Sequence, residues 1–138
     1  MVRAVEKART DWSMVAADAR EALRARSAIR RFIAAQADTS SDLDGVETIV
    51  GELIANVVQH APGAVGIHVA WDGDRATLVI ADRGPGIPIA RPVPDPQSTS
   101  GRGLLIVRAI APQVDIDSVA GYGSRVTVIL PVHRKRSA

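Results

Sequence analysis

The sequence lacks cysteine and is poor in aromatic residues, and each shortage narrows what the protein can be. With no cysteine among its 138 residues, the chain has no disulfide framework, no thiolate metal site and no cysteine nucleophile. Aromatic residues make up only 3% of it, so the core must consist mainly of Ala, Val, Ile and Leu. No apolar run approaches the about 20 residues of a membrane span, and the start of the chain lacks the apolar stretch of a signal peptide. We therefore expect a cytoplasmic protein that contacts no membrane.

Size and charge fit a single globular domain over residues 1–138. Hydrophobic residues account for 46% of the chain and charged residues for 23%, an ordinary balance for a globular protein. The formal net charge is +2, but three of the 17 basic residues are Arg134, Lys135 and Arg136. Without these three, 14 basic residues stand against 15 acidic residues, a net charge of −1. We interpret residues 132–138 as a basic, solvated tail and expect no direct nucleic-acid binding.

Hydrophobic spacing predicts a strand and two helices in the first half of the chain. Weak alternation predicts a strand over residues 12–16, and Asp18 is a capping residue for a helix that runs to about residue 36. Apolar residues at helical spacing predict the inner face of that helix: Leu23, Ile29, Phe32 and Ile33. A polar turn precedes a second helix over residues 42–60, which Ala61-Pro62-Gly63 ends.

The second half of the chain is mostly β-structure interrupted by a long loop. Two strands, at residues 65–71 and 76–81, flank Asp72-Gly73-Asp74, which is typical of a hairpin turn. Five prolines exclude helix and central strand from residues 84–101, and a loop of this length is usually functional. A third helix and two strands follow at residues 103–111, 114–119 and 125–130. This order predicts an α+β fold, a two-layer α/β sandwich with helices on one face of a mostly antiparallel sheet.

The second helix carries polar residues beside its apolar face. That face is formed by residues at helical spacing: Val46, Val50, Leu53 and Val57. Glu52, Asn56 and His60, spaced four apart, form a stripe along its edge. Polar residues beside a buried stripe are costly unless something uses them, although a solvated helix edge explains this pattern equally well.

Two further motifs follow the strand at residues 76–81. Asp82 stands at its end, where a carboxylate can accept a hydrogen bond from an exocyclic amine, and the glycines at Gly84 and Gly86 let a flat ring lie against bare backbone. Ser100-Gly101-Arg102-Gly103-Leu104 then precedes a helix, where free N–H groups and the positive helix end favour polyphosphate. Neither Walker A nor Rossmann spacing is present. Taken singly, the first motif also fits an ordinary turn and the second a capped linker.

In their order, the three motifs closely resemble those of the GHKL ATPase superfamily, which includes gyrase, heat-shock chaperones, histidine kinases and MutL. The motifs are Glu-x-x-x-Asn on a helix, Asp-x-Gly-x-Gly after a strand and Gly-x-Gly-Leu before a helix, and the resemblance covers residues 41–131. It implies the Bergerat fold with a mixed sheet, Mg-ATP as ligand, and an ATP lid between the last two motifs.

The resemblance also implies a role for each motif residue. Asn56 would coordinate Mg²⁺, Glu52 would be the general base, and Asp82 would bind the adenine amine. Family members usually carry threonine where Ser124 stands. His60 would lie near the phosphates or support the helix end. The residues expected around the nucleotide are Asn56, His60, Asp82, Gly84, Gly86, Ile87, Ser100, Gly101, Arg102, Gly103, Leu104 and Ser124.

Within the superfamily, the chain is most similar to stand-alone anti-sigma-factor serine/threonine kinases. Its three histidines, His60, His68 and His133, lie on no dimerising helical hairpin, and no transducer domain accompanies the motifs. The resemblance implies that the protein phosphorylates a serine on a STAS-type anti-anti-sigma partner. It is also compatible with sequestration of a sigma factor and with a homodimer. Two alternatives stay open: an ATP-binding partner-switching regulator without catalysis, which would not need Glu52, and a catalytic fragment of a histidine kinase.

Overall fold

A computed structural model describes residues 9–15, 19–60, 64–82, 100–119 and 123–136. The elements, in chain order, are β1 (Arg9–Val15), α1 (Ala19–Ala34), α2 (Leu43–His60), β2 (Ala64–Asp72), β3 (Arg75–Asp82), α3 (Ser100–Ile110), β4 (Gln113–Val119) and β5 (Gly123–Ile129). This is the order predicted from the sequence. The expected lid, between residues 83 and 99, lies outside the described residues, as does the capping residue Asp18. Within the described ranges, no helix combines the length and the apolar character needed to cross a bilayer.

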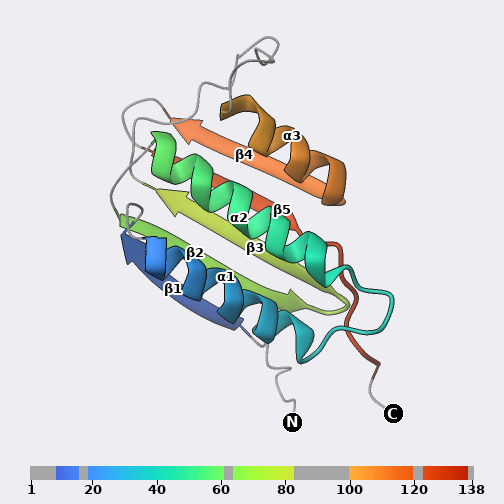
Figure 1. Ribbon diagram of the computed structural model, residues 1–138. Helices are drawn as coiled ribbons and strands as arrows, with labels where there is room; N and C mark the ends of the chain where they lie inside the picture. The colour runs from blue at the N-terminus through green and yellow to red at the C-terminus, as the bar shows by residue number, and fades with distance from the viewer. Residues whose placement is uncertain (1–8, 16–18, 61–63, 83–99, 120–122, 137–138) are drawn as a thin grey trace.

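The five strands form one sheet in the order β1-β2-β3-β5-β4, and the three helices lie on one face of it (Figure 1). The α+β, two-layer prediction is therefore confirmed. Each of the four strand pairs is antiparallel, so the described strands contain no parallel pair, whereas a mixed sheet was expected. The reason is that β4 and β5 form a hairpin that places β5 beside β3, and both pairings of β5 run antiparallel.

The core lies between the helix layer and the sheet and is almost entirely aliphatic. The predicted inner face of α2 is confirmed, since Val46, Val50 and Leu53 are at most 2% exposed. On α1, Ile29 and Ile33 are fully buried. Burial alternates along β3 and β5, as expected for strands covered on one face.

The prediction that Leu23 lies on the inner face of α1 is wrong, because this residue is 61% exposed. The buried stripe of α1 runs through Ala25, Ile29 and Ile33, which recur at intervals of four. Leu23 precedes Ala25 by two residues, and two residues on a helix correspond to a rotation of about 200°, away from that stripe.

The connection between α1 and α2 is fixed by side-chain caps. Asp42 precedes α2, and its carboxylate accepts a hydrogen bond of 2.8 Å from the backbone N–H of Gly45, so it caps the helix. The Asp38 carboxylate accepts hydrogen bonds from the hydroxyl and the backbone N–H of Ser40, at 2.7 and 3.0 Å. The Ser40 hydroxyl is the largest cause that lowers the pKa of Asp38 below its ordinary value.

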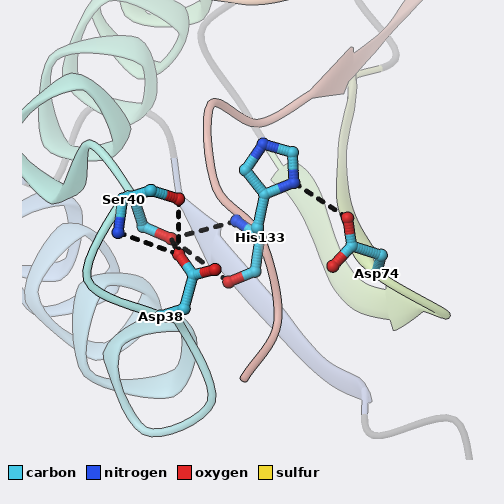
Figure 2. Close-up of polar contacts among 5 residues, drawn as sticks. Asp38, Ser40, Asp74 and His133 are labelled. Atoms are coloured by element: carbon cyan, nitrogen blue, oxygen red, sulfur yellow. Dashed lines mark hydrogen bonds and ion pairs between the residues drawn. The ribbon is translucent and has the colours of Figure 1, made fainter. Parts of the chain in front are cut away.

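The described part of the C-terminal segment is bound to this connection. The backbone N–H of Asp38 donates to the His133 carbonyl at 2.8 Å, and that of Lys135 donates to the Gln36 carbonyl at 2.6 Å. The His133 ring points the other way, with Nδ1 2.8 Å from a carboxylate oxygen of Asp74 (Figure 2). The segment thereby joins the α1–α2 connection to the β2–β3 turn, while the side chains of Lys135 and Arg136 stay exposed.

Candidate functional site

Four elements meet at the end of the sandwich opposite the β2–β3 turn. There α2 and β3 end, and α3 and β5 begin (Figure 1). The strand register fixes part of this arrangement, because Asp82 at the end of β3 lies between Val65 of β2 and Ser124 of β5. The described residues of all three predicted motifs therefore reach the same end of the molecule; of the second motif, Asp82 is the residue described.

The Glu-x-x-x-Asn motif lies on the last three turns of α2. Asn56 is only 9% exposed, whereas Glu52 is half-buried. In the described part of the chain, Asn56 and Ser124 are the two polar side chains that are buried. Burying an amide is unfavourable unless it finds a partner or a ligand, and an amide oxygen is a suitable hard ligand for Mg²⁺. The burial of Asn56 therefore fits the metal ligand expected there.

The start of α3 lies directly against Glu52. A Cβ built on Gly103 would be 3.3 Å from Oε2 of Glu52, which is closer than an ordinary van der Waals contact. It would be 3.7 Å from the carbonyl oxygen of Glu52, which is an ordinary contact. Glycine at this position lets the two helices approach so closely. The phosphate-binding sequence expected before α3 thus lies beside the predicted general base.

The helix itself begins earlier than predicted. The sequence indicated a start at Gly103, because glycines and small hydroxyl residues favour loops, but α3 begins at Ser100. Packing against α2 outweighs the low helix propensity of its glycines. Ser100, Gly101 and Arg102 therefore form the first turn, where backbone N–H groups have no partner within the helix. Such N–H groups suit an anion.

Asp82 and Ser124 form a direct contact that the sequence did not predict. The Ser124 hydroxyl donates a hydrogen bond of 2.6 Å to Oδ2 of Asp82, a short distance typical of a hydroxyl donating to a carboxylate. The two residues are 42 positions apart, so no spacing in the sequence could reveal the pair. Only the β3–β5 register brings them together.

The other predicted site residues are placed less completely. His60 is the last residue of α2, and its side chain lies outside the described residues, as do those of Ser100 and Arg102. Leu104 is partly buried and packs against the core. Gly84, Gly86 and Ile87 lie wholly outside the described ranges. Among the residues that are described, no group of three or more His, Asp or Glu side chains could hold a metal ion.

Sequence comparisons agree with this geometry. The family of histidine kinase-like ATPase domains matches residues 15–130. The serine/threonine-protein kinase RsbT of Bacillus subtilis (strain 168) is 38% identical over 91 residues, which cover 61% of this chain and 68% of that protein. An anti-sigma F factor of Bacillus licheniformis is 30% identical over 125 residues, which cover 82% of this chain and 84% of the relative.

Solved structures share the fold. The RsbU and RsbW domains of Rv1364c from Mycobacterium tuberculosis superpose with a TM-score of 0.68 at 20% identity, covering 92% of this chain and 32% of that one. The mycobacterial sensor histidine kinase MprB superposes with a TM-score of 0.54 at 21% identity, covering 94% of this chain and 100% of the other. These two likenesses concern the fold alone.

Proposed function

The chain belongs to the family of histidine kinase-like ATPase domains, and on that premise we propose that it is an ATP-binding regulatory serine/threonine protein kinase of the anti-sigma-factor type. The observation that carries the proposal is the placement of its buried polar groups. Asn56 and Ser124 are the two such side chains in the described part of the chain, and both lie on elements that meet at the candidate site. Ser124 is in turn hydrogen-bonded to Asp82.

The relatives support the kinase assignment and the class of partner. Several similar proteins bear the name anti-sigma F factor, and another is a serine/threonine-protein kinase. The proposed substrate is a serine on a STAS-type anti-anti-sigma protein. Sequestration of a sigma factor, a homodimer and a cytoplasmic location belong to the same proposal.

In this proposal the pocket recognises adenine through Asp82. The carboxylate that accepts the Ser124 hydroxyl at Oδ2 would also accept a hydrogen bond from the exocyclic amine of the base. The backbone N–H groups at the start of α3 would hold the phosphates, together with Gly101, Arg102 and Gly103. Asn56 would be the protein ligand of Mg²⁺, which when bound neutralises phosphate charge.

Glu52 is the proposed general base. Its carboxylate would accept the proton of the partner's serine hydroxyl as the hydroxyl oxygen bonds to the γ-phosphorus and ADP leaves. Its position beside the start of α3 supports this role, because the phosphates would lie against that helix end. Most of the rate enhancement would come from positioning the two reactants.

The test is the chemical form of the transferred phosphate. The purified protein is incubated with [γ-³²P]ATP, Mg²⁺ and the STAS-type protein encoded in the same genome, and the labelled product is then treated with acid and with base. A phosphoserine withstands acid and is eliminated by strong base, as the proposal expects. An acid-labile phosphohistidine would indicate a histidine-kinase fragment. ATP binding without any transfer would indicate a regulator that is not an enzyme.

A further inference from the structure

The α3 helix keeps two large apolar side chains exposed to solvent, next to each other in the sequence. Leu105 is 53% exposed and Ile106 is 38% exposed, whereas Val107, which follows them, is fully buried. Ala109, one turn further along the helix, is exposed as well. Single exposed apolar residues are common on proteins, so this small apolar patch, which we call the α3 surface, matters only through its position.

The contacts between α2 and α3 place Ile106 in the seam between these two helices, which lie side by side (Figure 1). A Cβ on Gly103 would be 3.3 Å from Oε2 of Glu52. At the other end of α3, a Cβ on Gly45 of α2 would be 2.9 Å from Cγ2 of Ile110. Gly103 and Ile110 therefore mark the side of α3 that faces α2. Ile106 follows Gly103 by three residues and precedes Ile110 by four, so it lies on that side, between the two contacts.

The α3 surface thereby borders the proposed general base. Along the helix axis, Ile106 is about 4.5 Å from Gly103, at 1.5 Å per residue, and Gly103 lies against the Glu52 carboxylate. On α2, Thr48 lies one turn before Glu52 and is half-buried and uncharged. Arg108 is exposed, but it is two residues from Ile106, a rotation of about 200°, and so points away from the seam. An incoming hydroxyl group thus meets an apolar surface beside the base.

We propose that the α3 surface receives the segment of the phosphorylated protein that carries the acceptor serine, and that an apolar side chain within two residues of this serine packs on Leu105 and Ile106. The inference rests on the proposed function, since the serine hydroxyl must reach Glu52. An extended chain advances about 3.3 Å per residue, so a neighbour one or two positions away lies about 3–7 Å from the serine. This range includes the rise from Gly103 to Ile106. The α3 surface is therefore a specificity determinant, and serines with only polar neighbours are poor acceptors.

The test compares two substitutions of similar shape in the seam. Ile106→Val and Ile106→Thr both give β-branched side chains, but only threonine carries a hydroxyl. Steady-state transfer is measured from [γ-³²P]ATP to the STAS-type protein encoded in the same genome. The threonine variant should have an acceptor KM about tenfold above that of the valine variant, at the same kcat. This split is expected when a contact binds the acceptor equally well before and during the reaction.

A second pair of variants covers Leu105. Leu105→Ser should raise the acceptor KM about tenfold above that of Leu105→Met, because methionine preserves an apolar side chain of similar volume. Thermal melts establish that all four variants are folded.

The acceptor supplies the complementary change. Mass spectrometry locates the phosphoserine, and each apolar residue within two positions of it is replaced by serine. One of these replacements should raise KM with the parent kinase but add nothing further with the Ile106→Thr variant, because the effects of two partners in one contact are not additive.

Calorimetric titration of Mg-ATP separates this inference from the proposed function. The four variants should bind Mg-ATP as the parent does, since none replaces a residue of the nucleotide site. Transfer by the parent with equal acceptor KM in Ile106→Val and Ile106→Thr would overturn the inference and leave the proposed function intact. Weaker ATP binding by Ile106→Thr alone would also overturn it, because the surface would then serve the nucleotide. If the parent transfers phosphate to no serine, the proposed function and this inference both fail.

Discussion

At the residue scale, the candidate site separates two polar groups that lie one helical turn apart. Asn56 is buried beside the core, and Glu52 is half-buried with its carboxylate against the start of α3. A buried amide suits a fixed metal ligand, whereas a proton acceptor must remain reachable by an incoming hydroxyl. The different burial of the two side chains therefore agrees with the different roles proposed for them.

This separation predicts different defects for two alanine substitutions. Asn56→Ala should lower both Mg-ATP affinity and phosphoryl transfer, because it removes the metal ligand. Glu52→Ala should keep ATP binding and slow transfer by roughly 10²-fold or more, the scale of a lost general base. Calorimetry and single-turnover transfer measure the two quantities. The matched control is Glu47→Ala, which removes a carboxylate of α2 that pairs with Arg30. This variant should keep both the ATP affinity and the transfer rate of the parent. If the Glu52→Ala variant transfers phosphate at the parent rate, Glu52 is not the general base.

The sequence predicted which residue types would gather at the site but not how they contact one another. Helical spacing placed Asn56 at the edge of an apolar stripe, a position that fitted a solvated helix edge equally well, and the structure shows that it is buried. The hydrogen bond from Ser124 to Asp82 could not be predicted, since it depends on the register of β3 against β5. Strand register between distant segments has no local signature in a sequence.

At the element scale, the approach of α3 to α2 depends on a residue without a side chain. Gly103 and Gly51 are both helical glycines, and alanine at an exposed helical position adds about 1 kcal/mol of stability. At Gly51 a Cβ would make ordinary contacts with Arg26, from 3.5 Å upward. At Gly103 the same Cβ would be 3.3 Å from Oε2 of Glu52, so one of the two helices or the Glu52 side chain must shift.

We therefore predict that Gly103→Ala impairs the site while Gly51→Ala does not. Gly103→Ala should remain folded and lose about tenfold in transfer rate, because small displacements of catalytic groups cost about this much or more. Gly51→Ala should transfer at the parent rate and melt at a slightly higher temperature. Thermal melts and transfer assays on both variants provide the measurement. Parent activity in Gly103→Ala would show that the close approach of α3 has no functional role.

Element boundaries and exposed faces were the least predictable features. The α3 helix starts three residues before its predicted start, because packing onto α2 overrides the weak propensity of its glycines. Leu23 was assigned to the core on spacing alone, although the stripe through Ala25 and Ile29 excludes it. Both differences result from tertiary packing, which local patterns do not contain.

At the scale of the whole molecule, the two ends of the sandwich carry different features. One end gathers the candidate nucleotide site, and the other binds the C-terminal segment to the α1–α2 connection and the β2–β3 turn (Figures 1 and 2). The layered fold itself was predictable, because strand and helix periodicities alternate clearly along the chain. The absence of a parallel pair among the described strands was not predicted, since pairing partners are set by the topology.

The C-terminal anchor predicts a stability that depends on acidity. The hydrogen bond from His133 is the largest cause that lowers the pKa of Asp74 in the folded protein. A lowered carboxyl pKa stabilises the fold above the unfolded value, about 3.9, and that contribution is lost as the pH falls through the folded value. Asp74→Asn should therefore lower stability at neutral pH, and the difference from the parent should shrink below about pH 4. Urea unfolding across this range measures it, with exposed Asp72→Asn as control. A difference independent of pH would contradict the anchor.

The central claim is that Asp82, held by Ser124, selects adenine. Calorimetric titration of ATP and GTP, with Mg²⁺, into the parent and Asp82→Asn tests it most directly. The account predicts that the parent binds ATP and scarcely binds GTP, because guanine presents a carbonyl where adenine presents its amine. It also predicts that Asp82→Asn loses about ten- to a hundredfold in ATP affinity, the scale of a charge-assisted hydrogen bond. GTP binding as tight as ATP binding in the parent, or unchanged ATP affinity in Asp82→Asn, would contradict it.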